Sequence, residues 1–386
     1  MNHRSLIIFS EDFPPNVGGI AQWAIGVARS LHRMGYGVRV LTRHMNKEAE
    51  KVQSQEPYPV IQVHGNRWRQ LRSLYANRAM KSLYESEVLP EVVIATTWNI
   101  ARGLVGVVKK HGTRLIVVVH GLEVTRKMPW MKRCWLINTL NAADIVIAVS
   151  RFTREQVIRR HGINPQKVIV LPNGVDPETF YPGVDTDALR HRFGLAGKKV
   201  ILTLARIVER KGHDKVIEAL PEVLKHVPNA HYLISGVREG ENYERIQRQV
   251  VELGLERDVT FTGYVAPEEI NQFYNLCDVY IMPSRELEGA GDTEGFGITF
   301  LEANACAKPV IGGRSGGVVD AIEDGKTGYL VDPLSAEEIA EKLIHILSDP
   351  LQARLLGENG MARITAGYTW DTVSGKITEL LEKKQV

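Results

Sequence analysis

The feature that most constrains the fold is a repeated alternation of short apolar runs with longer amphipathic stretches. Several apolar runs are continuous, such as Leu115–Val119 and Ile145–Val149, and have no polar residue at every second position. Strands that are buried on both faces of a parallel sheet have this pattern. Because amphipathic helical stretches separate the runs, the sequence predicts right-handed βαβ units in doubly wound α/β sheets.

The alternation occurs twice along the chain, which predicts two domains. The predicted strands are Leu6–Ser10, Val38–Thr42, Val60–Val63, Val92–Thr96, Leu115–Val119, Ile145–Val149, Val168–Leu171, Val200–Ala205, His231–Ser235, Val259–Thr262, Val279–Met282, Pro309–Gly312 and Gly328–Val331. A stretch with several prolines, Pro172–Pro182, lies between the two series, so we expect Rossmann-like domains at residues 1–184 and 185–370. Ligands of such sheets bind beyond the carboxyl ends of the strands, and two sheets facing each other would place the site in the cleft between them.

The charges divide unevenly between the two halves. Residues 1–180 contain 25 Lys and Arg and 13 Asp and Glu, a net charge of +12, whereas residues 181–386 contain 23 and 32, a net charge of −9. The three cysteines form no C-x-x-C motif, so a disulfide framework or a cysteine zinc site is not expected, and a reducing cytoplasm fits. No stretch approaches the roughly 18–20 apolar residues of a spanning helix. We therefore expect a cytoplasmic protein that is soluble or peripheral to a membrane.

Two features of the first half are candidate ligand contacts. The loop FPPNVGG, Phe13–Gly19, follows the first predicted strand, and its Gly18 and Gly19 let a ligand approach the backbone beside a helix N-terminus. The alternative is a tight turn without a ligand. The loop is not the G-x-G-x-x-G fingerprint, so NAD is not favoured. His120 follows a buried strand, where its imidazole either serves a reaction or is satisfied by a loop carbonyl.

The second half carries cations and carboxylates in glycine-rich turns. Arg206 and Lys211, in ARIVERKG, are the residue types that a diphosphate leaving group needs, although a solvated basic turn is the alternative. Glu294 and Glu302 form an E-x₇-E motif across a strand-to-helix turn. Carboxylates accept strong hydrogen bonds from ribose and sugar hydroxyls, and the amides of Gly295–Ile298 can cap phosphates. Ordinary helix-surface charge is the alternative for these carboxylates.

Together these motifs resemble those of the retaining family 4 glycosyltransferases of GT-B architecture. The ordered set is FPPNVGG, HG, SRFT, PNGVD, ARIVERKG, ISG, DVYIMPS and E-x₇-E, and a late aromatic motif, YTW, extends the resemblance over nearly the whole chain. The family implies transfer of a sugar from a nucleotide diphosphate donor with retained anomeric configuration. Two other classes remain open on the residues alone: a non-catalytic two-lobed sugar-binding protein and a nucleotide-sugar 2-epimerase.

The resemblance also implies a role for each candidate residue. Arg206 and Lys211 would bind the donor diphosphate and Glu302 the ribose. Glu294 would bind the transferred sugar together with backbone amides. Those amides belong to Gly295, Phe296, Gly297 and Ile298.

The remaining implied roles belong to the first half of the chain. His120 would lie against the sugar near its 6-position. Gly18 and Gly19 would flank the diphosphate and the acceptor. The last helix, about residues 371–386, would pack back across the first domain.

The donor and the mechanism follow from the same resemblance. The stretch SRELEGAGDTEGFGITFLEA and the segment HGLEV are similar to those of phosphatidylinositol mannosyltransferase-like members, which favours GDP-mannose, with UDP-glucose or UDP-N-acetylglucosamine as alternatives. The acceptor is expected to be a lipid-linked molecule or a glycan of cell-envelope or glycolipid synthesis. No carboxylate pair suits double displacement, so front-face attack is expected, with the diphosphate taking the acceptor's proton. No D-x-D metal motif is found at the site, so no tightly bound cofactor or divalent metal is expected.

Basic residues mixed with aromatics give the first half a candidate membrane surface. One set is Arg67, Trp68, Arg69, Leu71, Arg72 and Tyr75, and the other is Arg126, Lys127, Met128, Trp130, Met131, Lys132 and Arg133. Such mixtures suit the anionic inner face of the cell membrane. Solvated surface charge is the alternative, and no nucleic-acid motif accompanies either set. An anionic acceptor, or an anionic surface that carries it, would explain the basic half.

Overall fold

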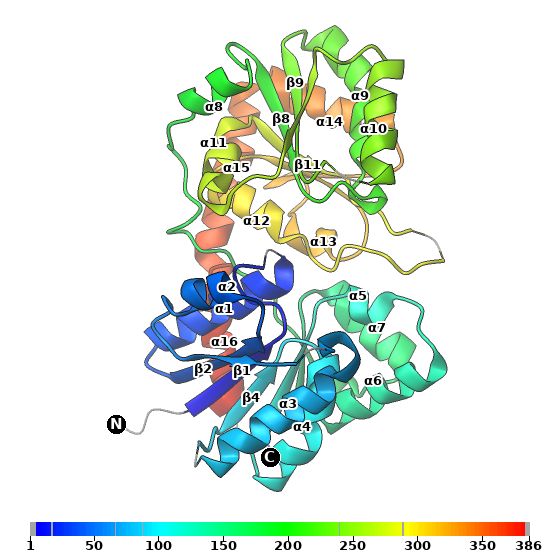
Figure 1. Cartoon of the computed structure of the whole chain (residues 1–386). Helices are drawn as coiled ribbons and strands as arrows, with labels where there is room; N and C mark the ends of the chain where they lie inside the picture. Colours follow the sequence, from blue (N-terminus) through cyan, green and yellow to red (C-terminus); the bar gives the residue numbers. More distant parts are fainter. Residues whose placement is uncertain are drawn as a thin grey trace. The chain divides into compact units, whose positions relative to one another are not determined.

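The computed structural model describes residues 5–382 apart from residues 17, 66, 87, 239 and 288. It divides into two compact units (Figure 1). Unit 1 is formed by the described parts of Met1–Gly174 and Trp370–Val386, and unit 2 is Val175–Thr369.

Unit 1 is a parallel sheet with the strand order β3-β2-β1-β4-β5-β6-β7. Its strands are β1 (Ser5–Ser10), β2 (Gly37–Arg43), β3 (Val60–Val63), β4 (Val92–Ala95), β5 (Arg114–Val119), β6 (Ile145–Ala148) and β7 (Val168–Val170). Its helices are α1 (Gly19–Arg33), α2 (Lys47–Gln53), α3 (Trp68–Glu85), α4 (Trp98–Lys110), α5 (Leu122–Thr125), α6 (Trp130–Ala142), α7 (Arg151–His161) and α16 (Trp370–Glu382).

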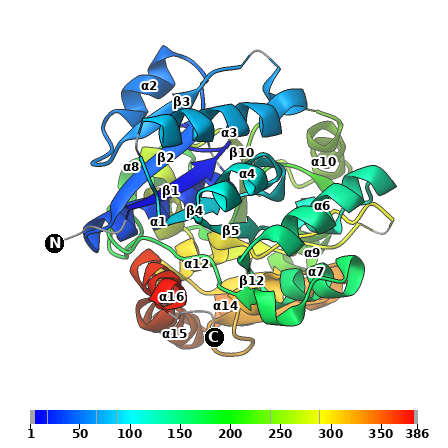
Figure 2. The same cartoon turned by 90° about the horizontal axis from the view of Figure 1, so that it is seen from below.

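Helices cover both faces of this sheet, which explains its continuous apolar strands. Ile7 and Phe9 of β1 belong to a buried cluster with side chains of α3, α4 and α6. Helices α1 and α16 lie on the opposite face (Figure 2). Trp370 packs so closely on α1 that a Cβ atom at Gly26 would lie 2.3 Å from its indole ring. The adjacent Asp371 accepts a 2.6 Å hydrogen bond from Ser30 Oγ.

Unit 2 repeats the architecture with the strand order β10-β9-β8-β11-β12-β13, and all pairs are parallel. Its strands are β8 (Lys199–Leu204), β9 (Ala230–Ser235), β10 (Val259–Gly263), β11 (Val279–Met282), β12 (Val310–Gly313) and β13 (Gly328–Val331). Its helices are α8 (Asp187–Arg192), α9 (His213–His226), α10 (Glu241–Glu252), α11 (Ile270–Leu276), α12 (Ile298–Ala305), α13 (Val318–Ala321), α14 (Ala336–Ser348) and α15 (Pro350–Gly367).

The predicted α/β fold is confirmed, and each predicted strand is found with its ends displaced by at most one residue. The short helices α2, α5, α8 and α13 were not predicted, because four to seven residues do not establish a helical period. Helix α16 is described as far as Glu382, so the predicted end of the last helix lies outside the described residues.

The division between the units lies between Gly174 and Val175, ten residues before the predicted boundary at 184/185. Backbone hydrogen bonds explain the difference. Val175 N donates to Tyr368 O at 2.8 Å, within unit 2. Further along, Val184 N donates to the side chain of Asn275 at 3.3 Å, next to the end of α11. The proline-containing stretch is therefore attached to unit 2 rather than forming a free linker.

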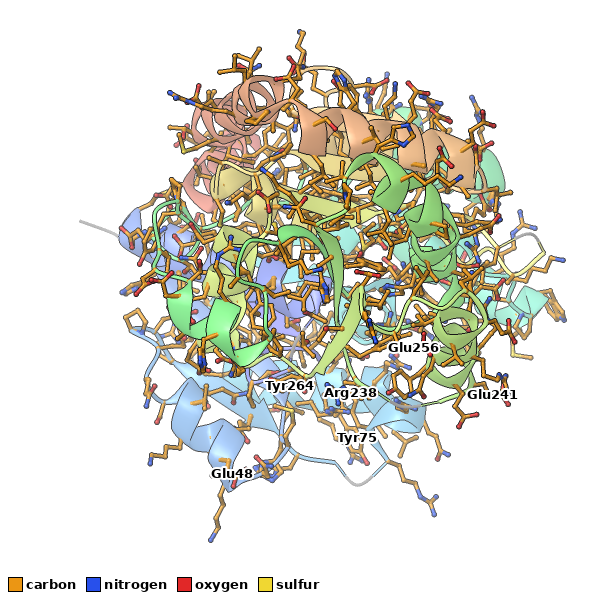
Figure 3. The ribbon with its side chains drawn as sticks, turned by 90° about the horizontal axis from the view of Figure 1, so that it is seen from above. Glu48, Tyr75, Arg238, Glu241, Glu256 and Tyr264 are labelled. Atoms are coloured by element: carbon orange, nitrogen blue, oxygen red, sulfur yellow. The ribbon has the colours of Figure 1, made fainter. Side chains whose placement is uncertain are left out.

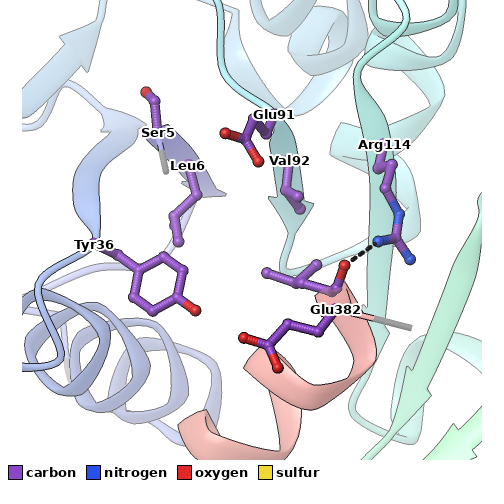
Figure 4. Close-up of a pocket in the computed structure, with 8 residues that line it drawn as sticks. Ser5, Leu6, Tyr36, Glu91, Val92, Arg114 and Glu382 are labelled. Carbon is purple, nitrogen blue, oxygen red and sulfur yellow. Dashed lines mark hydrogen bonds between the residues drawn. The ribbon is translucent and has the colours of Figure 1, made fainter. Parts of the chain in front are cut away.

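A pocket lies at the amino ends of the unit 1 strands β1, β4 and β5 (Figure 4). Leu6, Tyr36, Glu91 and Arg114 contribute to its lining, and Arg114 Nη1 donates to Leu381 O of α16 at 2.8 Å. Because ligands of parallel sheets bind beyond the carboxyl ends of strands, this pocket is at the opposite end from the predicted site.

Candidate active site

The loops after β8 and β11 lie side by side in unit 2. The chain runs from β8 outward to β10 and then returns to β11 on the other side of β8, which makes this pair the topological switch point of the sheet. Arg285 N donates to Arg210 O at 2.9 Å. A Cβ atom at Gly212 would lie only 2.3 Å from Pro283 O, so glycine permits this approach. The two predicted donor-binding segments are therefore brought together.

An Arg–Asp pair reinforces the contact between these loops. The Arg285 guanidinium donates two hydrogen bonds to the carboxylate of Asp214 on α9, at 2.9 and 2.8 Å. Both residues are buried. Burial raises the pKa of Asp214, but its bonds to Arg285 outweigh that effect and leave the pKa below its usual value. This ion pair therefore joins the loop after β11 to the start of α9, which directly follows the loop with Arg206 and Lys211.

Glu294 forms the centre of a buried ion-pair cluster. Lys211 Nζ lies 2.6 Å from Glu294 Oε2, and Arg210 Nη1 donates to the same oxygen. Arg210 Nε in turn lies 3.1 Å from Asp292 Oδ1. Burial favours the neutral form of Glu294, but the Lys211 and Arg210 charges outweigh it and lower its pKa to about 2. Glu294 is therefore a carboxylate that can accept hydrogen bonds from hydroxyl groups.

Arg206 differs from Lys211 in its surroundings. Its side chain is exposed, and within the part of unit 2 that the structure describes its guanidinium makes no hydrogen bond or ion pair. Its backbone oxygen lies 3.3 Å from Nε2 of the buried His213. Burial lowers the pKa of His213 to about 4, so the imidazole is neutral near pH 7. A buried histidine thus supports the backbone while the arginine head is open to an anionic ligand.

Glu302 lies on α12, eight residues after Glu294. It is buried, and the hydroxyl of Tyr274 donates a 2.6 Å hydrogen bond to its Oε2 atom. Burial raises the pKa of Glu302 to about 7, although the Tyr274 hydrogen bond acts against the rise. Gly297 precedes the helix with φ +91°, and a Cβ atom there would lie 2.7 Å from the Phe300 ring. The glycine therefore permits the turn that joins the two carboxylates.

The amides predicted to cap phosphate belong to Ile298, the first residue of α12, to its N-cap Gly297, and to Gly295 and Phe296 before it. The first amides of a helix have no partner within the helix and can donate to an anion. Gly317 N donates to Glu294 O at 2.8 Å, which holds the turn from the side of β12. That these amides bind phosphate stays a prediction.

The candidate histidine of unit 1 lies at the carboxyl end of a central strand. His120 follows β5, and its backbone N donates to the side chain of Glu123. Burial lowers the pKa of His120 to about 4, and its Nε2 atom is buried without a hydrogen-bond partner among the described residues. Its ring packs edge-to-face on Trp23, with centroids 6.2 Å apart. The imidazole is therefore neutral near pH 7, and its Nε2 atom could still form a hydrogen bond.

Gly18 and Gly19 border an open space at the start of α1. A Cβ atom at either position would meet no atom within 4 Å. Gly18 has φ +154°, which glycine adopts without strain. Val17 of the same motif lies outside the described residues.

Sequence reasoning did not identify Arg210, Asp292, Tyr274 or His213. Arg210 and Asp292 adjoin predicted residues, so charge within a motif was a usable signal. His213 directly follows the ARIVERKG motif and contacts Arg206 O, so the sequence had a local signal for it too. Tyr274 acts on Glu302, 28 residues away, and the sequence carries no signal for that contact. Among the described residues, no group of three or more His, Cys, Asp or Glu side chains could hold a metal ion. That no metal is needed stays a prediction.

Arg238 and Tyr264, labelled in Figure 3, follow β9 and β10, whose carboxyl ends lie at the same edge of the parallel sheet as those of β8 and β11. Arg238, after β9, donates to Phe261 O of β10. Tyr264 follows β10 and is 64% exposed. The carboxyl ends of these strands thus also carry a cation and an exposed aromatic ring.

Two sequence families match the two halves of the chain. Residues 17–179 match the family described as Glycosyltransferase Family 4, and residues 185–363 match Glycosyl transferases group 1. Together these segments contain all of the predicted site residues, from Gly18 to Glu302.

Named relatives extend over nearly the whole chain. The sequence is 34% identical to a GDP-mannose-dependent alpha-(1-6)-phosphatidylinositol monomannoside mannosyltransferase of Mycolicibacterium smegmatis, with 98% of this chain and 99% of that protein covered. It is 29% identical to a GDP-mannose-dependent monoacylated alpha-(1-6)-phosphatidylinositol monomannoside mannosyltransferase of Corynebacterium glutamicum, with coverage of 99% and 98%.

Solved structures share the fold. Anabaena Alr3699/HepE, determined with UDP and glucose, has a TM-score of 0.82 at 22% identity, covering 98% of this chain and 99% of that one. A glycosyltransferase from Rickettsia africae has a TM-score of 0.83 at 21% identity, with both chains fully covered. The predicted GT-B fold, with two Rossmann-like domains, is confirmed by these similarities.

Proposed function

We propose that this chain, which belongs to the family 4 glycosyltransferases, transfers mannose from GDP-mannose to a phosphatidylinositol mannoside with retained configuration. The observation that carries the proposal is the Lys211–Glu294–Arg210 cluster at the switch point of unit 2. Next to it in the chain is the exposed Arg206, whose guanidinium has no hydrogen-bond or ion-pair partner among the described residues. The similarity to named mannosyltransferases favours this donor over UDP-glucose or UDP-N-acetylglucosamine. It also favours transfer over epimerisation or sugar binding alone.

Arg206 and Lys211 would neutralise the donor diphosphate. The exposed Arg206 can bind two phosphate oxygens at once, and Lys211 contributes a point charge. Lys211 is held by Glu294 before the donor binds, so the incoming phosphate would share or replace that partner. The backbone amides at the start of α12 would donate to the same group.

The two carboxylates would each bind one of the two sugars of the donor. Glu294 would accept hydrogen bonds from hydroxyls of the transferred mannose, and Glu302 from hydroxyls of the ribose. The low pKa of Glu294 keeps it charged at any physiological pH. The roles predicted for His120, Gly18 and Gly19 stay predictions.

The reaction exchanges one bond at the anomeric carbon for another. The bond from that carbon to the diphosphate oxygen breaks, and a bond to the acceptor oxygen forms on the same face. The acceptor's hydroxyl proton passes to the departing diphosphate, and GDP leaves. Retention follows because attack and departure share a face. The protein's contribution is to stabilise the negative charge of the leaving group.

A glycolipid acceptor requires access to a membrane surface, and the structure distinguishes the two candidate basic sets. In the first set, Trp68 is buried and stacks on Tyr75, while Arg72 pairs with Glu11 at 2.9 Å. The second set includes Trp130, which is 75% exposed, and Met131, which is 50% exposed. Within the described residues no helix has the length and apolarity to cross a bilayer.

We therefore propose that residues 126–135, named here the α6 surface, contact an anionic membrane peripherally. Arg126, Lys127, Lys132 and Arg133 are exposed around the apolar side chains. Each cation near such a surface contributes about 1 kcal/mol, and the indole of Trp130 suits the interface.

Replacing Trp130 with alanine is expected to weaken binding to vesicles of phosphatidylinositol and phosphatidylcholine by about tenfold. Leu351 of unit 2, which is 80% exposed, is the matched control, because Leu351→Ala removes a similarly exposed apolar group elsewhere. Vesicle co-sedimentation measures both, at low and high salt. Equal binding by the two variants, or binding that salt does not weaken, would exclude the α6 surface.

Nucleotide binding tests the proposed donor. A ligand that binds only the folded state raises the unfolding free energy by about 2.7 kcal/mol at 100 times its Kd. We expect GDP to raise the thermal unfolding midpoint more than UDP at equal concentration. A larger shift with UDP would reject GDP-mannose in favour of a UDP-sugar.

A further inference from the structure

A buried tyrosine hydroxyl is bonded to the carboxylate proposed to bind ribose. Tyr274 lies on α11, its exposed fraction is 0%, and its hydroxyl donates to Glu302 Oε2 at 2.6 Å. Because the side chain has no exposed surface, it cannot itself contact a bound nucleotide. Any effect of this hydroxyl on the donor must therefore pass through Glu302.

Aromatic packing fixes the position of the hydroxyl. The Tyr274 ring meets Phe180 edge-to-face, with centroids 5.8 Å apart, and Tyr280 in the same way at 5.6 Å. Tyr280 continues the contact to Phe300 of α12 at 5.6 Å. The Tyr274 hydroxyl is therefore held in place by a rigid cluster of packed rings, unlike the hydroxyl of a mobile surface side chain.

Glu302 uses only one of its two oxygens in this bond. Within the described part of unit 2, Oε1 accepts no hydrogen bond, and it is absent from the atoms that are buried without a partner. Oε1 is thus the oxygen left for a ligand hydroxyl. With Oε2 fixed, rotation of the carboxylate about its last bond is restricted, so Oε1 has a defined direction.

We propose that Tyr274 is a positioning residue for the donor: its hydroxyl orients the Glu302 carboxylate so that Oε1 accepts from the ribose hydroxyls. The inference rests on the proposed function, because it takes Glu302 as the ribose contact. A purely structural role, in which Tyr274 only satisfies a buried carboxylate, would leave recognition of the ribose hydroxyls unchanged.

The experiment compares GDP with 2′,3′-dideoxy-GDP, which lacks the hydroxyls in question. Kd values are measured by calorimetry for the unaltered protein, for Tyr274→Phe and for Tyr280→Phe. Tyr280→Phe is the matched control, since it removes the hydroxyl of a neighbouring buried tyrosine that donates to Leu204 O and Met282 Sδ and not to Glu302. Circular dichroism and denaturant unfolding check that each variant is folded.

We expect the unaltered protein to bind GDP at least about tenfold more tightly than the dideoxy compound, since hydrogen bonds to a carboxylate are strong. Tyr274→Phe should reduce this ratio to about threefold or less and leave the Kd of the dideoxy compound unchanged. Tyr280→Phe should keep the full ratio. With GDP-mannose, Tyr274→Phe should raise KM and leave kcat within about twofold, because ribose binding is common to ground and transition states.

The pH dependence supplies a second readout. The ionisable groups that face Glu302 are Tyr274, Tyr280 and Cys306. Among these, the Tyr274 hydrogen bond lowers the pKa of Glu302. Its removal should therefore move the loss of GDP affinity, which occurs as Glu302 becomes protonated on acidification, to higher pH. Tyr280→Phe should shift the profile less.

The outcomes separate the inference from its premise. If the unaltered protein binds both nucleotides equally, Glu302 is not the ribose contact and that part of the proposed function fails. If it discriminates but Tyr274→Phe discriminates equally well, the positioning role is wrong and the proposed function stands. Should Tyr274→Phe unfold, the variant Tyr274→Phe in a Glu302→Gln background replaces it. In that background, the GDP affinity of the double variant is compared with that of Glu302→Gln alone. A difference of more than about twofold between the two would show that Tyr274 does not act through the carboxylate.

Discussion

Lys211→Ala is expected to lower kcat/KM for sugar transfer by about 10²–10³, the usual loss when one contact to developing negative charge is removed. Lys211 is buried beside Glu294 at 2.6 Å, at the switch point where the diphosphate is proposed to bind. Arg206→Ala should cause a similar loss for the same reason. Its guanidinium is exposed and makes no hydrogen bond or ion pair within the described residues, so stability should not change.

Lys215→Ala provides the matched control for this experiment. Lys215 lies four residues further along, on α9, where it pairs with Glu218 at 2.7 Å on the surface. Such pairs contribute little, so activity and stability should remain close to those of the unaltered protein. Release of GDP in the presence of acceptor measures all three variants. Near-normal turnover by either Lys211→Ala or Arg206→Ala would contradict the diphosphate assignment.

Glu294→Gln is expected to impair both stability and transfer. The carboxylate balances the charges of Lys211 and Arg210, and removing one partner of a buried ion pair costs about 3–5 kcal/mol. Transfer should fall by about 10² or more, because the sugar loses its proposed charged acceptor and the diphosphate loses an ordered Lys211. Denaturant unfolding and steady-state kinetics measure the two effects. Glu218→Gln on the surface of α9 is the control.

The stability effect of Glu294 also has a defined pH dependence. Its pKa in the folded protein is about 2, below the ordinary value of 4.5. A depressed carboxyl pKa stabilises the folded state above the unfolded pKa, and this stabilisation is lost as the pH falls from about 5 to about 2. A pKa shift of this size corresponds to a contribution of about 3 kcal/mol to the free energy of unfolding. The difference in unfolding free energy between the unaltered protein and Glu294→Gln should therefore become smaller as the pH falls. A difference that does not change with pH would contradict the assignment.

The fold could be predicted from sequence because its signals are local. Continuous apolar runs mark strands buried on both faces, and residues such as Pro14 and Gly297 mark the loops at their ends. Short helices such as α13 contain too few residues to show a period. The boundary between the units was misplaced, because it depends on a hydrogen bond between Val175 and Tyr368, far apart in sequence.

The site could be predicted only in part, for the same reason. The spacing of Glu294 and Glu302 is visible in the sequence, but their partners are not: Arg210 is 84 residues from Glu294, and Tyr274 is 28 residues from Glu302. Sequence also could not choose between the two basic sets. The choice depends on the burial of Trp68 and the exposure of Trp130, which only the fold determines.

Transfer of radiolabelled mannose tests the central claim most directly. The protein is incubated with GDP-mannose and vesicles that contain a phosphatidylinositol mannoside, and the lipid product is analysed for label and for cleavage by an α-mannosidase. We predict a labelled glycolipid with an α-linked mannose, formed together with one equivalent of GDP, and no product from UDP-glucose or UDP-N-acetylglucosamine. Transfer from a UDP-sugar with none from GDP-mannose, or a β-linked product, would contradict the proposed function.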